Sequence, residues 1–479
     1  MTVTDNPISS EPIDLTGRRV AVIGLARSGM ASARFLLGRG ARVVGADAKT
    51  GEELADERHQ LLELGGEFVE RFATRAQLGA IDLVVVSPGV PEEHPALQMV
   101  RAEGIPIIGE LELAYRFCAA PVIAVTGTNG KGSTCVMIGS ILAAAGIDHL
   151  VAGNIGLPLI SQVDRTEEVQ FVVLEVSSFQ MESIDRFRPY VAALLNISPD
   201  HLDRHPDFST YLRAKYRMFS NQRPTDFAVI SLDDPCLQPL IGDLTAQLLT
   251  FSLHNPEANA RVEEDRLVLE IEPGSPEAVG AVEDLPVGGD HFVRNALAAA
   301  LAARLVGADS TAIAAGLAAF HPADHLLQVV ATIRGVRFVD DSKATNVAAA
   351  LADLACLGRP LVPLVGGVSK NVDFHEFGER LGRECLAVCL VGESSEVLAK
   401  AIGDRTRVVK CGSLEEAVET AFSLAPEGAT VALLPGCASF DMFRDQVDRG
   451  QAFTRCVREL SYRYAVPEEA SADDAGSGA

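Results

Sequence analysis

The 479-residue chain carries a formal net charge of −24 at pH 7, and 48% of its residues are hydrophobic. At about 150 residues per domain, this length predicts roughly three domains. The acidic balance argues against a nucleic-acid partner, and no apolar run reaches the roughly 18 residues of a membrane span. Because the first residues lack the basic and apolar regions of a signal peptide, we expect a cytoplasmic protein that does not insert into membranes.

Short β-rich apolar runs alternate with longer helical patterns along the chain. This alternation is typical of α/β layers built on parallel sheets. The polar ends, 1–13 and 466–479, are low in aromatic residues and are expected to be disordered. Between them we predict three domains, over residues 14–119, 120–322 and 323–465.

The first block begins with a strand, "RRVAVIG", followed by the turn "GLARSG" at 24–29 and a helical pattern. Asp47 ends the next strand, where an acidic group can bind a ribose hydroxyl. A G-x-A-x-x-G turn alone is also common in ordinary α/β folds, so a nucleotide site and a purely structural turn remain equally open. The "SPGV" stretch at 87–90 follows another strand and is expected at the same sheet edge.

The second block opens with the strand "VIAV", which leads into "TGTNGKGST" at 126–134 and then a helix. Glycines let backbone N–H groups approach phosphate oxygens, the helix N-terminus favours negative charge, and Lys131 adds a point charge. We therefore predict a phosphate-binding loop. The common P-loop pattern places a hydroxyl residue directly after the lysine, where this chain has Gly132. A metal-ligating hydroxyl would then have to come from Ser133 or Thr134.

Polar residues follow the next two strands of this block. Glu175 ends an apolar strand, where it could be a Mg²⁺ ligand or a solvated strand-end carboxylate. His201 and His205 lie in "NISPDHLDRH", but a transition-metal site is disfavoured because no third cluster stands at ligand spacing. Lys215 lies on an amphipathic helical pattern, and a solvated lysine is the default interpretation of that pattern.

Taken together, these motifs resemble the Mur ligase family over nearly the whole ordered length. The resemblance is carried by "GTNGK", "GNIGLP" (153–158), "LEVSSFQ", "DHLDRH", "RAK" (213–215), "DDSKATN" (340–346) and "PGCASFD" (435–441). Within the family, "SSFQ" and "DSKATN" are typical of the members that add D-glutamate. The resemblance implies an N-terminal Rossmann-like domain for a UDP sugar, a central P-loop ATPase-like parallel sheet and a C-terminal Rossmann-like domain for the amino acid.

The implied activity is an ATP-dependent ligation in cytoplasmic peptidoglycan precursor synthesis. ATP would phosphorylate the alanyl carboxylate of UDP-N-acetylmuramoyl-L-alanine, and the amine of D-glutamate would attack the acyl phosphate to give an amide, ADP and phosphate. The resemblance thus implies ATP and Mg²⁺ as cofactors and small-molecule substrates as partners. We expect the protein to act as a monomer.

The resemblance also implies roles for individual residues. The expected catalytic residues are Lys131, Glu175, His201, Lys215 and Lys343. The expected ATP-binding residues are Gly127, Thr128, Asn129, Gly130, Lys131, Gly132, Ser133, Thr134, Asn295 and Asp341. The expected UDP-sugar-binding residues are Arg27, Ser28, Asp47, Lys49, Ser87, Pro88, Gly89 and Asn154. The expected amino-acid-binding residues are Thr345, Lys370, Ser439 and Phe440. The expected metal ligands are Ser133, Glu175, His201 and a carbamylated Lys215.

The chain departs from the family pattern at four positions on the nucleotide or reaction side. Gly132, Phe292, Leu326 and Val368 replace a hydroxyl residue, an Asn, an Arg and an Asp. One alternative is therefore a catalytically weakened UDP-sugar-binding paralogue. Another is a folylpolyglutamate synthase-like ligase, which shares the form "GTNGKGS" but lacks the N-terminal block. An NAD-dependent oxidoreductase, suggested by "GLARSG" alone, does not explain the phosphate loop.

Overall fold

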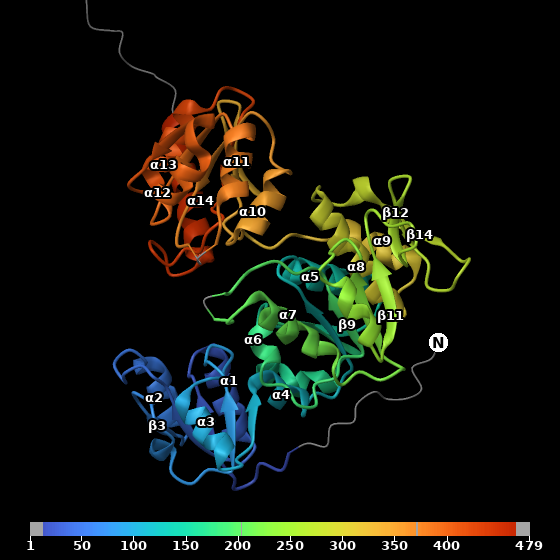
Figure 1. Cartoon of the computed structure of the whole chain (residues 1–479), viewed down its shortest axis with the longest axis vertical. Coiled ribbons are helices and arrows are strands. Elements are labelled where there is room, and N and C mark those ends of the chain that lie inside the picture. The colour runs from blue at the N-terminus through green and yellow to red at the C-terminus, as the bar shows by residue number, and fades with distance from the viewer. Residues whose placement is uncertain (1–12, 203, 370–371, 466–479) are drawn as a thin grey trace, which may run out of the picture. The chain divides into compact units, whose positions relative to one another are not determined.

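The computed structural model describes residues 13–202, 204–369 and 372–465. The predicted fold class is confirmed: the chain is α/β and builds three sheets (Figure 1). The chain divides into two compact units between His321 and Pro322. The first unit contains two of the sheets and the second unit contains the third. Lys370 lies outside the described residues. The two ends that we expected to be disordered also lie outside them, with the exception of Ile13.

The N-terminal sheet has five parallel strands in the order β3-β2-β1-β4-β5. Its strands are β1 Arg19–Ile23, β2 Arg42–Ala46, β3 Glu67–Val69, β4 Leu83–Val86 and β5 Ile107–Gly109. Its helices are α1 Arg27–Gly38, α2 Ala55–Glu63, α3 Pro95–Ala102 and α4 Glu110–Tyr115. β1 pairs with β2 on one side and with β4 on the other, so the order of the strands reverses direction at β1. Open α/β sheets bind ligands at such a switch point, outside the carboxyl ends of the strands.

The central sheet has nine strands in the order β14-β13-β12-β11-β10-β9-β6-β8-β7. Its strands are β6 Val122–Thr126, β7 His149–Gly153, β8 Phe171–Glu175, β9 Val191–Leu194, β10 Phe227–Ser231, β11 Gln247–Phe251, β12 Ala260–Glu263, β13 Arg266–Leu269 and β14 Glu277–Ala281. Its helices are α5 Lys131–Ala144, α6 Ser178–Met181, α7 Phe208–Tyr216, α8 Asp290–Leu305 and α9 Ser310–Ala318. In the described part of this sheet, the pairings β12–β13 and β13–β14 are antiparallel and the other pairings are parallel. β6 lies between β8 and β9, so its carboxyl end is a second switch point.

The sheet of the second unit has six strands in the order β15-β16-β20-β17-β18-β19. Its strands are β15 Gln328–Ile333, β16 Val336–Asp340, β17 Leu361–Val365, β18 Ala387–Leu390, β19 Arg407–Lys410 and β20 Thr430–Leu433. Its helices are α10 Val347–Leu354, α11 His375–Glu384, α12 Ser395–Ile402, α13 Leu414–Leu424 and α14 Gln446–Ala465. β15 and β16 form an antiparallel hairpin, and the other neighbours are parallel. β20, the last strand, pairs with both β16 and β17.

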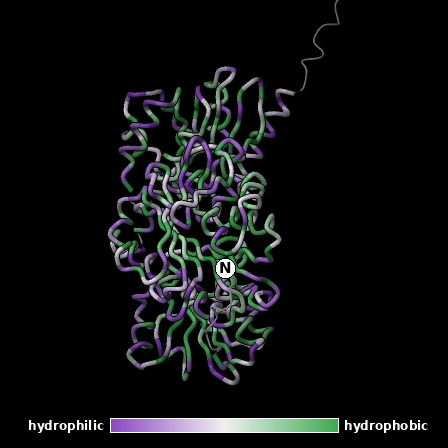
Figure 2. The backbone as a smooth tube through the Cα atoms, turned by 90° about the vertical axis from the view of Figure 1, so that its right-hand side faces the viewer, coloured by the Kyte–Doolittle hydropathy of each residue, from purple (hydrophilic) through white to green (hydrophobic). Residues whose placement is uncertain are grey.

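In Figure 2, hydrophobic residues are green, and long green runs of the backbone alternate with purple, hydrophilic segments. The strands β4, β6, β8, β9 and β17 are buried along their whole length. Such continuous apolar runs are typical of parallel strands that are covered by helices on both faces. Among the described residues, no helix combines the length and apolar character that crossing a bilayer requires.

Candidate nucleotide and ligation site

The phosphate loop joins the end of β6 to the start of α5. Gly127 and Gly130 have φ angles of 155° and 83°, and Gly130 is the left-handed N-cap of α5. A Cβ at Gly130 would lie 2.3 Å from Oδ1 of Asn295 on α8. The glycine is therefore required twice, by its backbone conformation and by the close approach of Asn295. The predicted ATP-binding residue Asn295 thus contacts the loop directly, although it lies more than 160 residues away in sequence.

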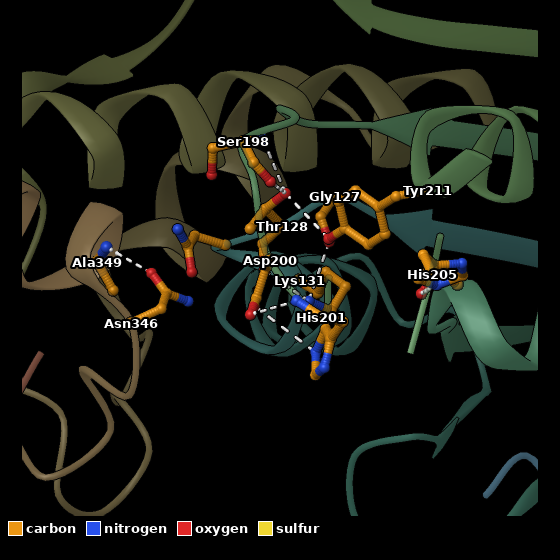
Figure 3. A network of polar contacts seen from close by, with 12 residues as sticks. Gly127, Thr128, Lys131, Ser198, Asp200, His201, His205, Tyr211, Asn346 and Ala349 are labelled. Carbon is orange, nitrogen blue, oxygen red and sulfur yellow. Dashed lines mark hydrogen bonds and ion pairs between the residues drawn. The ribbon is translucent and has the colours of Figure 1, made fainter. Parts of the chain in front are cut away.

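A hydrogen-bond network holds the loop against the segment that follows β9. Oδ1 of Asn196 accepts the N–H groups of Thr128 and Asn129 at 3.1 and 2.9 Å, and Nδ2 of Asn196 donates to the Asn129 carbonyl at 3.0 Å. The Thr128 hydroxyl lies 3.1 Å from the Tyr211 hydroxyl and accepts the Ser198 N–H at 3.0 Å (Figure 3). These hydrogen bonds hold Thr128 and Asn129 of the loop in place.

Two lysines converge on the loop from different helices. Nζ of Lys131 donates to the carbonyls of Gly127 and Thr128 at 3.0 and 2.8 Å, and Nζ of Lys215 donates to the Gly127 carbonyl at 2.8 Å. Lys215 is only 2% exposed, and its Nζ lies 4.7 Å from the centre of the Tyr211 ring. Burial lowers the pKa of Lys215 well below its ordinary value, and Lys131 lowers it further. The solvated lysine expected from the helical pattern is therefore wrong, and the role that the family resemblance implies for Lys215 stays a prediction.

Carboxylates face the two lysines. Oε1 of Glu175, at the end of β8, accepts the Asn154 side-chain amide at 2.7 Å. Asp200, which is 6% exposed, accepts the His201 backbone N–H at 2.8 Å, and its Oδ2 lies 3.6 Å from Nε2 of His201. His201 has a φ of 55°, which turns its ring back towards Asp200. Negative charge on both Asp200 and Glu175 acts on Lys215. The site therefore places oxygen ligands and cations within one small volume.

The hydroxyl groups after Lys131 have different environments. The Thr134 hydroxyl is fully buried and donates to the Gly130 carbonyl at 2.9 Å, inside the helix. Ser133 is partly exposed. A Cβ at Gly132 would lie 3.1 Å from Oε2 of Glu175, so the missing side chain leaves room for that carboxylate. Of the two hydroxyls left open by the sequence, Ser133 is thus the one available to a metal ion.

We expect Ser133→Ala to weaken Mg²⁺-dependent turnover by raising the Mg²⁺ concentration needed for half-maximal rate. Thr134→Val, which keeps the volume but loses the intrahelical bond, should cost about 1 kcal/mol of stability and leave the Mg²⁺ requirement unchanged. Titration of the initial rate with MgCl₂ measures the first effect and thermal unfolding the second. The assignment of Ser133 is wrong if Thr134→Val alone changes the Mg²⁺ dependence.

His205 has a structural role. Its Nε2 lies 3.0 Å from the Ser178 hydroxyl, and its ring stacks on Phe179 with centroids 5.4 Å apart. Burial, together with the positive charge of Arg204, lowers the pKa of His205 to about 4, so the ring is neutral at pH 7. Within 13–202, 204–369 and 372–465, no group of three His, Cys, Asp or Glu side chains could hold a metal ion.

The predicted UDP-sugar loops meet at the switch point of the N-terminal sheet. The Ser87 hydroxyl donates to the Gly24 carbonyl at 2.6 Å, and a Cβ at Gly29 would lie 1.8 Å from the same oxygen. Oδ2 and Oδ1 of Asp47 accept the backbone N–H groups of Leu25 and Lys49, at 2.8 and 3.0 Å. Asp47 therefore shapes the turn itself. Its contact with a ribose stays a prediction, and so do the assignments of Arg27, Ser28, Lys49, Pro88 and Gly89.

In the second unit, the end of β16 carries two adjacent buried carboxylates. Asp340 lies 2.7 Å from Nδ1 of His325. Oδ1 of Asp341 accepts the Leu327 N–H at 3.2 Å. Burial raises the pKa of Asp341 well above its ordinary value, and the neighbouring carboxyl of Asp353 raises it further. Leu326, which stands where the family has an arginine, is half-buried between His325 and Leu327.

Arg449 connects the segments of the second unit that lead to Lys343 and to Ser439. The Arg449 guanidinium donates to the Ser342 carbonyl at 2.9 Å and to the Cys437 carbonyl at 3.1 Å. Lys343 directly follows Ser342, and Ser439 lies two residues after Cys437. Lys343 is exposed, Thr345 is half-buried, Ser439 is 2% exposed and Phe440 is 72% exposed. The side chain of Asn346 caps α10 by accepting the Ala349 N–H at 2.8 Å (Figure 3).

The other departures from the family pattern have local explanations. Phe292 is 1% exposed on α8, with its ring centre 4.3 Å from that of His291, so it belongs to the core of the central domain. Val368 forms a backbone bridge with Ala438, a contact that does not depend on its side chain.

Sequence reasoning missed three residues that build these sites: Asp200, Tyr211 and Arg449. Asp200 lies with Asn196 in the motif "NISPDHLDRH", and a polar residue just after a buried strand is the signal that points to Asn196 and could have found Asp200 as well. Tyr211 and Arg449 carry no comparable signal, because each lies within a helix and its role follows from burial and from partners distant in sequence.

A strand, a glycine turn and a helix N-terminus with two converging lysines define an α/β protein built to bind a phosphorylated ligand. Sequence profiles identify the three domains: the Mur ligase MurD-like N-terminal domain matches residues 18–109, the Mur ligase middle domain 125–303, and the Mur ligase glutamate ligase domain 327–437. The chain belongs to the Mur ligase family.

Relatives match over nearly the full length. A UDP-N-acetylmuramoylalanine--D-glutamate ligase from Pelotomaculum thermopropionicum is 40% identical over 93% of this chain and 99% of its own. A UDP-N-acetylmuramoylalanine--D-glutamate ligase from Geobacter metallireducens is 39% identical over 94% of this chain and 99% of its own. Among solved structures, a pseudomurein peptide ligase type C from Methanothermus fervidus has a TM-score of 0.60 and 19% identity, covering 93% of this chain and 100% of that chain. The last likeness concerns the fold alone.

Proposed function

We propose that this protein is an ATP-dependent ligase that adds D-glutamate to UDP-N-acetylmuramoyl-L-alanine in peptidoglycan precursor synthesis. The observation that carries the proposal is the 40% identity, over 93% of the chain, to a relative that bears the name of this activity. The MurD-like N-terminal domain at 18–109 favours this function over that of a folylpolyglutamate synthase-like ligase. The protein would act in the cytoplasm as a monomer.

The reaction has two steps. A carboxylate oxygen of the alanyl group attacks the γ-phosphorus of ATP, the bond to ADP breaks, and an acyl phosphate forms. The amine of D-glutamate then attacks the carbonyl carbon, phosphate leaves, and the amine loses a proton to solvent. Phosphate is a far better leaving group than the oxide of a free carboxylate, and the protein contributes mainly by positioning the reactants and by neutralising charge.

The chain's own residues fit these tasks. The first turn of α5 directs backbone N–H groups at the ATP phosphates. Lys131, which bonds to loop carbonyls here, can turn its Nζ to the transferred phosphoryl group. Asn295 packs on Gly130 and lines the nucleotide side of the loop. Lys343, Thr345, Ser439 and Phe440 would hold D-glutamate, as would Lys370, which lies outside the described residues.

The surroundings of Glu175 fit a divalent cation, since Gly132 leaves its Oε2 uncovered at the start of α5. Ser133, Glu175, His201 and carbamylated Lys215 would hold Mg²⁺, with Asp200 orienting His201. Bound Mg²⁺ would neutralise charge on the transferred phosphoryl group. Burial lowers the pKa of Lys215 and so favours the neutral amine, which is the form that would add to CO₂ with loss of a proton to give an anionic carbamate ligand.

The test is an assay of the purified protein with ATP, MgCl₂, UDP-N-acetylmuramoyl-L-alanine and either D- or L-glutamate. We expect phosphate release and amide product with the D isomer only. Tight binding of the UDP sugar without phosphate release from either isomer would instead identify the weakened paralogue. Release with L-glutamate, or with a folate substrate in place of the UDP sugar, would assign a different ligase.

Leu326 offers a test of how far the departures weaken the enzyme. We expect Leu326→Arg to lower the KM for ATP by about tenfold, because it would restore a charge-assisted bond to phosphate worth roughly 1.5 to 3 kcal/mol. Steady-state kinetics with varied ATP measure the effect, and Leu326→Gln is the uncharged control of similar length. An unchanged KM in both variants would mean that this position does not face the nucleotide.

A further inference from the structure

The residue that joins the N-terminal and central domains of the first unit is a buried carboxyl, Glu110. It is the first residue of α4, directly after β5, and is 1% exposed. Its Oε1 accepts the backbone N–H of Ile160, at the start of the 3₁₀ helix η2 (Leu159–Glu167), over 3.4 Å. Its carboxyl also accepts a hydrogen bond from the Gln180 side chain. Neither the sequence motifs nor the proposed reaction has assigned a role to Glu110.

Gln180 connects Glu110 to the segment that follows β8, the strand that ends at Glu175. Its Oε1 accepts the N–H and the hydroxyl of Ser177 at 3.0 and 3.1 Å, and its own N–H donates to the Ser177 hydroxyl, which forms a capping box on α6. Ser177 follows Glu175 by two residues. A continuous path of hydrogen bonds and short backbone thus leads from the last strand of the N-terminal sheet to the proposed metal ligand.

The same two side chains line a pocket that includes a predicted UDP-sugar loop. The pocket wall contains Ser87, Pro88 and Val90 from one domain, Phe179 and Gln180 from the other, and Glu110 between them. Backbone contact reinforces this junction, because the Gly109 N–H donates to the Ser183 carbonyl at 2.9 Å. Glu110 therefore lines the same pocket as the predicted sugar loop and Gln180.

We infer that Glu110 is a positioning residue, which acts through Gln180 to align the bound UDP sugar with the phosphate loop and does so in its uncharged form. The inference rests on the proposed function for the identity of the substrate. A neutral carboxyl places no negative charge beside the pyrophosphate of the substrate, whereas an ionised one would repel it. The proton of the neutral acid also gives the pocket a donor, which a carboxylate lacks.

The surroundings of Glu110 bring its titration close to neutral pH, where the protonated and ionised forms are both present. Burial raises its pKa to about 7, against the opposing effects of the Ile160 and Gln180 hydrogen bonds and of Arg27 on α1. The other titratable group in the pocket wall is Glu182, and burial raises its pKa as well. The facing residue on β4–α3, Ser87, donates its hydroxyl proton to the Gly24 carbonyl. Arg27 is thus the one positive group acting on Glu110 from the packed elements of the described chain.

The experiment compares the wild type with Glu110→Gln, Glu110→Ala and an exposed control on η2, Glu167→Gln. Binding of UDP-N-acetylmuramoyl-L-alanine is measured by calorimetry without ATP or glutamate, between about pH 5.5 and 8.5. The acidic groups of the substrate itself stay ionised over this window. We expect the wild-type Kd to rise about tenfold as the pH passes from one unit below to one unit above the pKa of Glu110. The Kd of Glu167→Gln should depend on pH in the same way. The Kd of Glu110→Gln should not change over this range.

Kinetics and unfolding complete the test. Glu110→Ala should raise the KM for the UDP sugar with little change in kcat, and Glu110→Gln should restore it. For an acid whose folded pKa is raised, stability falls as the pH rises from the unfolded to the folded value, so wild-type stability should decline between about pH 4.5 and 7 relative to Glu110→Gln. A Glu110→Gln binding profile as steep as the wild type overturns the inference, whether or not ligation occurs. Absence of ligation with the expected binding profile overturns only the proposed function.

Discussion

Replacement of Lys215 by alanine is expected to lower turnover by about 100-fold or more, because it removes the proposed carbamate ligand from the centre of the site. The physical basis is the burial of this lysine beside Lys131, Asp200 and Glu175. If the lysine acts as a carbamate, short carboxylic acids such as acetate or formate should partly restore turnover by supplying the missing carboxylate. Initial rates of phosphate release, with and without added acid, measure both effects.

Two variants control for this result. Lys215→Met fills the same space and should be as inactive as the alanine variant, which excludes a simple cavity effect. Arg213→Ala changes an exposed cation on the same helix and should keep wild-type rates. Turnover of Lys215→Ala within about threefold of the wild type would remove Lys215 from the site, whatever the acids do.

Replacement of Gly130 by alanine is expected to abolish tight ATP binding. The new methyl group would meet Oδ1 of Asn295 at 2.3 Å, and the φ angle of 83° is unfavourable for any residue with a Cβ. The strain alone should cost roughly 1–2 kcal/mol of stability. Since Asn295 or the loop must move to relieve the clash, the N–H groups that face the phosphates are displaced as well. Calorimetric titration with ATP measures this loss.

A variant at Gly146, just beyond the C-terminal end of α5, separates the effect of backbone strain from the effect of the clash with Asn295. Gly146 has a φ of 68°, but a Cβ there would have no neighbour within 4 Å. Gly146→Ala should therefore show the same strain in thermal unfolding while ATP binding stays at the wild-type level. Equal loss of ATP binding in both variants would mean that global destabilisation, and not the contact with Asn295, explains the Gly130 result.

Local patterns predicted well wherever neighbouring residues determine the geometry. The phosphate loop was predictable because strand, glycine turn, lysine and helix N-terminus lie within 13 residues, and the structure places them together. The α/β class was predictable because buried parallel strands read as continuous apolar runs. Asp47 was only half predictable: its place after a strand is visible in the sequence, but its two bonds to backbone N–H groups come from the folded turn.

By itself, the sequence determined the fold class, the family resemblance and the phosphate loop with Lys131, whereas its local pattern predicted a solvated Lys215. Only the tertiary structure decided that Lys215 is buried, that Ser133 and not Thr134 keeps an available hydroxyl, and that Asp200 and Asn196 belong to the site. It also brought Glu110 to Gln180 across 70 residues of sequence. The physical reason is that burial and pKa depend on groups from distant strands and helices, whose approach no local pattern records.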